Sequence, residues 1–573
     1  MGLDEDHEHG GRTGGALGEM ELEVALNKVG TGRFQLLVLL ICGLANAADA
    51  IEILSVGLLG TAAEEELGLS PRRTGILSAC IFGGMFVGGL SWGFLGDAIG
   101  RRPSLIAALT INALFGAMSS GAHSLFELVV LRTLAGVGVG GSVPIVFTAM
   151  SEFCSAHSRG KLLAGVASFW MVGSLTCAAL GWAVIPAAGW RMFVLLASVP
   201  AWTTALLAAA FLPETPRWLL VKGKGEWALA VLRHIGQVNR CELPNGLSLR
   251  PLHVPSDEGG SDDDGPSPTA APPRDARTRG GAPLAPLLRS GAPAAPPAGL
   301  ARNSQQGLQQ GQQQGRPQRR VLHALLLGEL AQYTWPLIGG WVALCGGWYS
   351  MVLWLPRYFE ARGATGGSIY AQTFAVAAGN LPGNLASLWL IDRLGRRLTC
   401  VVCMAAGCVA ALAFAAAPAG GAWPTIAAMV FNGVSVPGWN ALDAISAELY
   451  PTSVRSTGFG LLGATGRLSS LVCTYAAGEL LDVALWAPLV FAAVLLAGGS
   501  ACMMRLPEPA GAPLQDSIGE VQRGGSQAQQ EHRGAAGQQH RGGDGGDADD
   551  GAEAALLSPQ FLPSSFVALQ GRE

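Results

Sequence analysis

The stretch Gly96-Asp97-Ala98-Ile99-Gly100-Arg101-Arg102 separates two long apolar segments of this 573-residue chain. A similar stretch, Ile391-Asp392-Arg393-Leu394-Gly395-Arg396-Arg397, separates two apolar segments in the second half, and Asp97 and Asp392 lie 295 residues apart. Short signatures that recur in the same order predict a structural unit used twice. Two further signatures keep nearly this offset: Glu152 with Arg159 recurs as Glu448 with Arg455, and Leu212-Pro213-Glu214 recurs as Leu506-Pro507-Glu508.

The composition is that of a membrane protein. The chain is 50% hydrophobic and only 14% charged, whereas soluble domains carry about a quarter charged residues. Most of the 11 cysteines lie inside apolar runs, where they are expected to act as small packing residues. We therefore expect no metal, no cofactor and no nucleic-acid partner. Because no nucleophile–base pair stands out, we do not expect an enzyme.

Twelve segments have the length and apolarity of a spanning helix, which needs about 20 residues. The predicted class is an all-α membrane protein with 12 transmembrane helices in two six-helix bundles. The expected spans are 34–59, 74–96, 104–121, 125–149, 163–185 and 192–212, followed by 334–355, 370–391, 398–417, 423–443, 457–476 and 484–506.

The polar segments divide the chain further. Residues 241–320 are rich in Pro, Gly, Gln, Ala and Arg and bury too little apolar surface to fold. The predicted parts are a cytoplasmic tail (1–30), a first bundle (31–218), a cytoplasmic linker (219–322, largely disordered from about 241), a second bundle (323–510) and a disordered cytoplasmic tail (511–573). The paired arginines of the repeated loops place both termini in the cytoplasm, because basic loops stay on that side.

The first span carries three polar side chains on one face, Asn46, Asp49 and Glu52, each one helical turn from the next. An ionisable group in the bilayer is costly and indicates function. The expected partner is Arg132 on the fourth span. A cavity that alternately pairs and unpairs Asp49 with this cation would couple a proton to a solute, so Asp49, Glu52 and Arg132 are the predicted proton-coupling residues. The alternative is a static ion pair that joins two helices.

Deep aromatic residues form a second group of candidates. An aromatic ring can stack on a solute and still offer an N–H or O–H group. Asn440 and Asp443 add polar groups beside Trp439. Plain core packing is an equally good interpretation of each ring. The predicted substrate-binding residues in these spans are Asn46, Trp170, Trp348, Tyr349, Trp439, Asn440 and Asp443.

The repeated loops are expected to form a conformational gate. Gly100 and Gly395 permit tight turns, and Asp97 and Asp392 would favour a neighbouring helix N-terminus. We expect Glu152 with Arg159, and Glu448 with Arg455, to complete a network that holds the two halves together. The predicted gate residues are Gly96, Asp97, Gly100, Arg101, Arg102, Glu152, Arg159, Asp392, Gly395, Arg396, Arg397, Glu448 and Arg455.

These residues resemble the major facilitator superfamily, whose loop between the second and third helices is similar to Gly96–Arg102 and recurs after the eighth helix. Leu212–Trp218 and Glu448–Thr452 are similar to its sugar-porter branch. Ala48–Glu52, Phe169–Gly173 and Trp439–Asp443 resemble the synaptic vesicle glycoprotein 2 group, and Trp389–Arg396 resembles the related synaptic vesicle 2-related protein.

The resemblance implies two bundles around an alternating-access cavity lined by the candidates above. It also implies that Asp49 and Arg132 match the proton-coupling pair of sugar porters. Arg467 is similar to the eleventh-helix cation of organic-ion transporters, which makes it a further substrate-binding candidate. The short Arg357–Ile369 loop and the absence of any Asn-x-Ser/Thr acceptor depart from synaptic vesicle glycoprotein 2, so a synaptic role does not carry over.

The leading hypothesis is a secondary active transporter, a proton-coupled symporter of a small polar organic solute. It would lie in the plasma membrane or in a vesicle or vacuole membrane. One alternative is a uniporter of the same solute class. Another is a non-transporting receptor or trafficking protein that reuses the fold, with cytosolic partners bound to the linker and tail.

Overall fold

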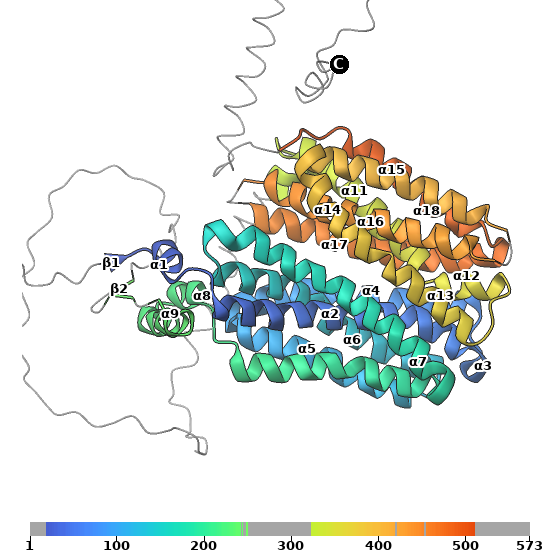
Figure 1. Ribbon diagram of the computed structural model, residues 1–573, viewed down its shortest axis with the longest axis horizontal. Coiled ribbons are helices and arrows are strands. Elements are labelled where there is room, and N and C mark those ends of the chain that lie inside the picture. The colour runs from blue at the N-terminus through green and yellow to red at the C-terminus, as the bar shows by residue number, and fades with distance from the viewer. Residues whose placement is uncertain are drawn as a thin grey trace, which may run out of the picture. The chain divides into compact units, whose positions relative to one another are not determined.

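The computed structural model describes residues 19–241, 243–244, 248–249, 322–418, 421–451 and 454–509. Most of the predicted linker from 241 onward, and the predicted C-terminal tail 511–573, therefore lie outside the described residues. The helices fall into two groups along the chain (Figure 1). We refer to the first group, α2–α7, as the first half, and to the second, α11–α18, as the second half.

The first half contains five long helices. They are α2 (Arg33–Ala62), α4 (Pro71–Ile99), α5 (Arg101–Met118), α6 (Leu125–Phe153) and α7 (Ala156–Phe211), with the short α3 (Glu64–Leu67) and η1 (Ser119–Gly121) between them. The α7 helix contains both the fifth and the sixth predicted span. It is broken at Gly189, whose φ of 77° is non-helical and suits a residue without a Cβ.

The second half begins with α11 (Ala331–Val352), which bends by 45° into α12 (Leu355–Ala361). One predicted span, 370–391, is divided between α13 (Gly367–Ala378) and α14 (Asn380–Leu394). The remaining helices are α15 (Arg396–Ala415), α16 (Trp423–Glu448), α17 (Arg455–Val483) and α18 (Ala487–Met503). Each of the twelve predicted spans thus overlaps one or two helices.

Length and composition alone qualify seven of the described helices as membrane spans, or eight when α11 and α12 count as one bent span. The helices approach each other through small residues, as packing in lipid requires. A Cβ on Gly84 or Gly88 of α4 would collide with the α6 backbone at Thr133 or Val137. The lipid-facing surface is apolar, and Phe94, for example, is 67% exposed.

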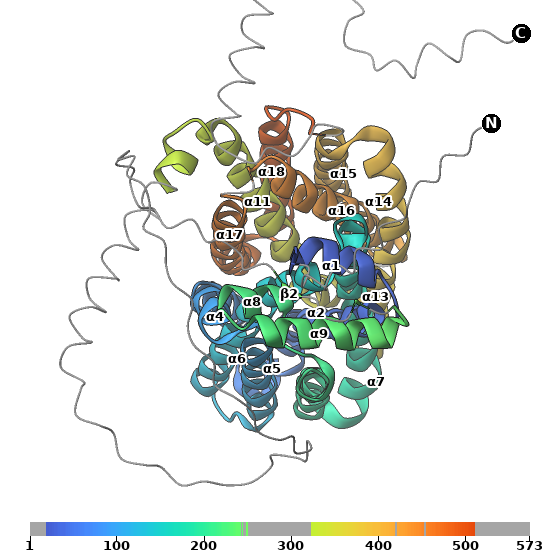
Figure 2. The ribbon, with the colours of Figure 1, turned by 90° about the vertical axis from the view of Figure 1, so that its left-hand side faces the viewer.

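Contacts between α4 and α17, and between α7 and α13, join the two halves. At the end of the bundle that carries Arg101, Arg102, Arg396 and Arg397, which we call the basic end, smaller elements lie against the first half (Figure 2). They are α1 (Leu22–Val29), α8 (Pro216–Val221), α9 (Gly225–Asn239) and a parallel pair of two-residue strands, β1 (Glu19–Met20) and β2 (Ser248–Leu249). Asn239 attaches α9 to the start of α2 by accepting from the Phe34 N–H at 3.0 Å.

Candidate transport site

Asp49 is buried in the first half and is held by two neutral donors. The Ser142 hydroxyl on α6 donates to one carboxylate oxygen at 2.6 Å. The Asn112 amide on α5 donates to the other oxygen at 3.3 Å. The side chain is 0% exposed. Three helices of the first half therefore converge on one carboxylate that no arginine contacts directly among the described hydrogen bonds.

Arg132 pairs with Glu52 and not with Asp49. Its Nη1 atom lies 2.5 Å from Glu52 Oε1, and both side chains are buried. The same nitrogen donates to the Ser55 hydroxyl at 3.2 Å. This corrects the expectation that Arg132 would be the direct partner of Asp49. The Glu52–Arg132 pair joins α2 to α6 and leaves Asp49 separate.

Asn46 also has a structural contact. Its amide nitrogen donates to the Val166 carbonyl of α7 at 3.0 Å. The predicted role in solute binding therefore competes with a role in fastening α2 to α7.

A second cation, Arg467, is half-buried and belongs to the other half. It donates to the Tyr349 hydroxyl at 3.4 Å. Its charge acts on Asp49 of the first half and on Asp443 of the second. The Tyr349 ring packs edge-on against Phe82 of α4 at 4.7 Å, which brings this group to the interface between the halves.

The predicted aromatic residues on α11 and α16 form one cluster. Trp348 packs edge-on against Tyr349 at 4.8 Å and against Trp439 at 6.3 Å. Trp341, which was not predicted, extends the cluster, because it lies 6.1 Å from Trp439 and donates to the Ser446 hydroxyl at 3.0 Å. Trp170 is half-buried on α7 and takes no part in the described ring contacts of this cluster.

Asn440 faces a neighbouring helix, because its amide donates to Ser387 at 2.9 Å and to Asn384 at 3.4 Å, both on α14. Two functional candidates were missed by sequence reasoning, Asn380 and Asn432. A buried amide in an apolar helix is the signal that would have found them.

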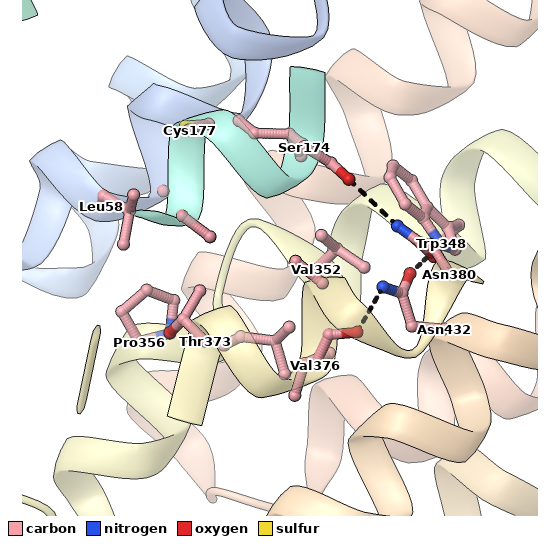
Figure 3. A pocket seen from close by; sticks show the side chains of 15 residues that line it. Leu58, Ser174, Cys177, Trp348, Val352, Pro356, Thr373, Val376, Asn380 and Asn432 are labelled. Carbon is pink, nitrogen blue, oxygen red and sulfur yellow. Dashed lines mark hydrogen bonds between the residues drawn. The ribbon is translucent and has the colours of Figure 1, made fainter. Parts of the chain in front are cut away.

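A small cavity of about 40 Å³ lies between the halves beside this cluster (Figure 3). Asn380 donates to the Ser174 hydroxyl across the cavity wall at 3.1 Å. Trp348 donates to Asn432, which in turn donates to the Val376 carbonyl, at 3.1 and 3.0 Å. A space of this size holds one or a few waters. An organic solute would therefore need the halves to move apart.

At the basic end, Arg101 connects several parts of the first half. Its guanidinium contacts Asp97 at 2.6 Å and Glu152 at 3.2 Å. The Glu214 carboxylate accepts the backbone N–H groups of Arg101 at 2.9 Å and Arg102 at 3.3 Å. These N–H groups begin α5 and have no partner inside the helix. Burial raises the pKa of Glu214, and the N–H donors act in the opposite direction.

The second half repeats this arrangement. Glu508 accepts the backbone N–H groups of Arg396 and Arg397, each at 2.9 Å. Arg396 also lies 3.2 Å from Glu448. The repeated Leu-Pro-Glu signature thus supplies a carboxylate to a helix that begins more than 100 residues earlier in the chain.

Comparison with known proteins identifies the architecture. The family model described as "Sugar (and other) transporter" matches residues 47–244 and 306–518. The chain belongs to this transporter family. It is therefore a multi-pass membrane protein with the fold of the major facilitator superfamily, and the predicted twelve-helix, two-bundle class is confirmed.

The relatives of this transporter include two groups. Organic cation/carnitine transporter 7 of Arabidopsis thaliana is 28% identical over 521 residues, which cover 87% of this chain and 96% of the relative. Synaptic vesicle glycoprotein 2A of Homo sapiens is 26% identical over 637 residues, covering 86% and 80%.

The similar solved structures include the xylose transporter XylE from E. coli in a partially occluded inward-open conformation. It has a TM-score of 0.61 and 16% identity, and the match covers 84% of this chain and 100% of that one. At this identity the similarity establishes the fold of the transporter.

Two pairings expected at the basic end of this transporter are wrong. Glu152 pairs with Arg101, whereas Arg159 lies 3.5 Å from Glu23 of α1. Arg455 donates to the Tyr450 carbonyl at 3.2 Å, whereas Glu448 pairs with Arg396. An equal Glu-to-Arg spacing in the sequence does not predict an ion pair when another arginine lies closer to the glutamate in the folded structure.

The carboxylates at the helix N-termini are Glu214 and Glu508, not the predicted Asp97 and Asp392. Gly100 and Gly395, with φ of 112° and 82°, do make the expected tight turns. A Cβ on Gly395 would lie 2.7 Å from the Glu508 carboxyl carbon. These contacts stay inside one half, so they do not hold the two halves together as expected.

Removing either carboxylate should weaken its own half. We expect Glu214→Ala and Glu508→Ala each to lower the free energy of unfolding by about 0.5–2 kcal/mol, the usual cost of losing a helix N-terminal acceptor. Thermal melting of the purified transporter measures this effect. Glu226→Ala on the exposed surface of α9 is the control, and a loss no larger than that of the control would contradict the assignment.

Proposed function

We propose that this transporter moves a small polar organic solute by alternating access and couples the movement to a proton at Asp49. The observation that carries the proposal is the position of Asp49, buried at the centre of the first half with two neutral donors. Because Glu52 already neutralises Arg132, Asp49 is free to gain and lose a proton without breaking that pair. A buried carboxylate in a membrane helix is energetically costly, and this cost indicates that the residue has a function.

The proton has a route to the conformational change through Arg467. The charge of Arg467, on the second half, acts on the Asp49 carboxylate of the first. An ionised Asp49 attracts the second half, and a protonated one does not. Protonation would therefore shift the balance between two arrangements of the halves. One solved structure of this fold is that of a proton:xylose symporter. Its coupling agrees with the proposal, but at 17% identity the similarity establishes the fold alone.

The side chains at the interface favour a polar solute. Asp443 and Arg467 offer both signs of charge, and Trp348 and Trp439 offer aromatic faces. One relative is an organic cation/carnitine transporter. We place both termini in the cytoplasm, with the basic end on that side.

We propose further that the structure is closed at the end opposite the basic end. Two described ion pairs join the halves there: Arg357 with Glu64, and Arg72 with Glu479 at 3.0 Å. The Asn380–Ser174 hydrogen bond is a third link. Opening toward that side requires these contacts to break, whereas the basic-end clusters stay intact within each half.

A solute screen tests the function. The full-length protein is purified, and its melting temperature is measured with sugars, organic acids, betaines and amines. Any solute that stabilises it is then tested for uptake into liposomes under a pH gradient. We expect one solute class both to stabilise the protein and to move together with protons. Uptake that is independent of the pH gradient would favour the uniporter. A solute that stabilises the protein but is not taken up would favour a receptor.

Breaking the ion pairs between the halves should favour opening at that end. We expect Arg357→Gln combined with Arg72→Gln to increase labelling of Val352→Cys, beside the cavity, by about 2- to 30-fold, because partly exposed pairs contribute about 0.2–1 kcal/mol each. A membrane-impermeant thiol reagent measures the rate. Arg191→Gln is the control, because it removes an ion pair inside one half at the same end. Equal rates in the two variants would contradict the proposed closure.

A further inference from the structure

A second hollow lies on the surface of the first half, away from the transport site. It has a volume of about 620 Å³ and lies between the start of α4 and the start of α6. Its lining includes the polar residues Glu66, Arg73 and His123 and the apolar residues Ile76, Phe126 and Val129. We call it the α4–α6 groove. A groove lined by both charged and apolar side chains matches a molecule that has both.

The charges in the α4–α6 groove are unevenly satisfied. Glu66 accepts from Arg191 at 2.5 Å and from the Trp190 ring nitrogen at 2.7 Å, and these hydrogen bonds lower its pKa. Arg73 donates to the Gly68 carbonyl at 2.9 Å, which is a neutral acceptor. Arg191 therefore neutralises the Glu66 carboxylate, and the nearby Glu127 carboxylate accepts the His123 backbone N–H at 2.8 Å. The charge of Arg73 meets only a neutral carbonyl among the described hydrogen bonds and is available to an anion in the groove.

Apolar side chains that line the α4–α6 groove are exposed on the surface of the first half. Phe126 is 77% exposed and Ile76 is 39% exposed, and both lie within the first two turns of spanning helices. This position corresponds to the boundary between headgroups and hydrocarbon, where an arginine extends toward the polar layer and aromatic rings collect. An arginine at this depth can reach the phosphate of a lipid headgroup.

We propose that the α4–α6 groove binds one phospholipid, with its phosphate at Arg73 and the upper part of an acyl chain over Ile76, Phe126 and Val129. The site is separate from Asp49 and does not rest on the proposed solute or on proton coupling. The groove lies beside Arg191, which follows the break in α7 at Gly189 by two residues. Arg191 also donates to the Ser120 and Ala122 carbonyls.

Native mass spectrometry of the full-length protein in an alkyl maltoside tests the proposal, with phosphatidylglycerol as the probe. We expect one lipid to be retained by the wild type. Arg73→Gln should weaken retention about fivefold, the effect of one basic residue on an anionic lipid. Phe126→Ser should weaken it by a similar factor, and Arg73→Lys should restore most of it.

The controls separate a site from the general lipid shell. Phe94→Ser removes an equally exposed phenylalanine from the other end of α4 and should not change retention. Inorganic phosphate should not displace the lipid. Equal retention in Arg73→Gln, Phe126→Ser and the wild type would overturn the proposal, as would equal losses in Phe94→Ser and Phe126→Ser. Melting temperatures identify a misfolded variant, in which case Arg73→Lys and Phe126→Ser decide.

Discussion

Asp49→Asn should abolish accumulation of solute while preserving exchange. If one proton accompanies each solute, every unit of pH difference supports about a tenfold concentration ratio, or about 1.4 kcal/mol. An asparagine fits the same space, its single oxygen can still accept from Asn112, and its NH2 group can donate to the Ser142 hydroxyl, but it cannot release a proton. The accumulation ratio in liposomes with an imposed pH gradient should therefore fall to about one.

Counterflow of labelled solute without a gradient should continue in the same variant, because binding and the conformational change need not involve net proton movement. Glu226→Gln on the exposed surface of α9 controls for loss of a carboxylate elsewhere. An Asp49→Asn protein that still concentrates its solute would exclude Asp49 as the coupling residue. A protein that loses both activities would instead indicate a role in solute binding.

Arg132→Met should be the most destabilising single change among those considered. It leaves the Glu52 carboxylate buried without its cation, and breaking such a pair costs about 3–5 kcal/mol. The double variant Glu52→Gln with Arg132→Met should recover much of this loss, because a buried pair contributes little net stability compared with uncharged residues of similar size. Thermal melting of the wild type, Glu52→Gln, Arg132→Met and the double variant gives the coupling energy between the two positions.

The double variant also separates the two interpretations of the pair. If the pair is a static link between α2 and α6, the folded double variant should accumulate solute normally. If the pair takes part in coupling, the double variant should melt normally but fail to accumulate. A double variant as unstable as Arg132→Met alone would show that the loss comes from packing around Arg132 rather than from the uncompensated charge of Glu52.

The membrane architecture could be read from the sequence because it depends on segment length and on repetition. A spanning helix has to be about 20 apolar residues long, and the duplicated loops fix the boundary between the halves. The boundary between the fifth and sixth spans, which lies within α7, was harder to predict from the sequence. Its two predicted spans are separated by only a few residues around Gly189, and the structure continues as helix on both sides.

The partner of Arg132 could not be read in the same way. Asp49 and Glu52 are three residues apart, which is about 4.5 Å along a helix, so both lie within reach of a long arginine side chain. Which carboxylate it meets depends on the heights of α2 and α6 relative to each other. The helix-capping roles of Glu214 and Glu508 could not be predicted from the sequence for a different reason. Glu214 acts on a helix that begins at Arg101, and no local periodicity reports such a contact.

The caps Glu214 and Glu508 bear on the ancestry of the chain. Each carboxylate lies at the end of a six-helix unit and binds the third helix of that same unit. A single unit therefore already contains everything needed to complete its own basic end. Doubling such a unit requires no new residues there, and adaptation to the partner unit is left to the opposite end, where Arg72, Arg357 and their carboxylates have no repeated counterparts among the signatures described above. Duplication of such a unit would require new contacts only where the two halves meet.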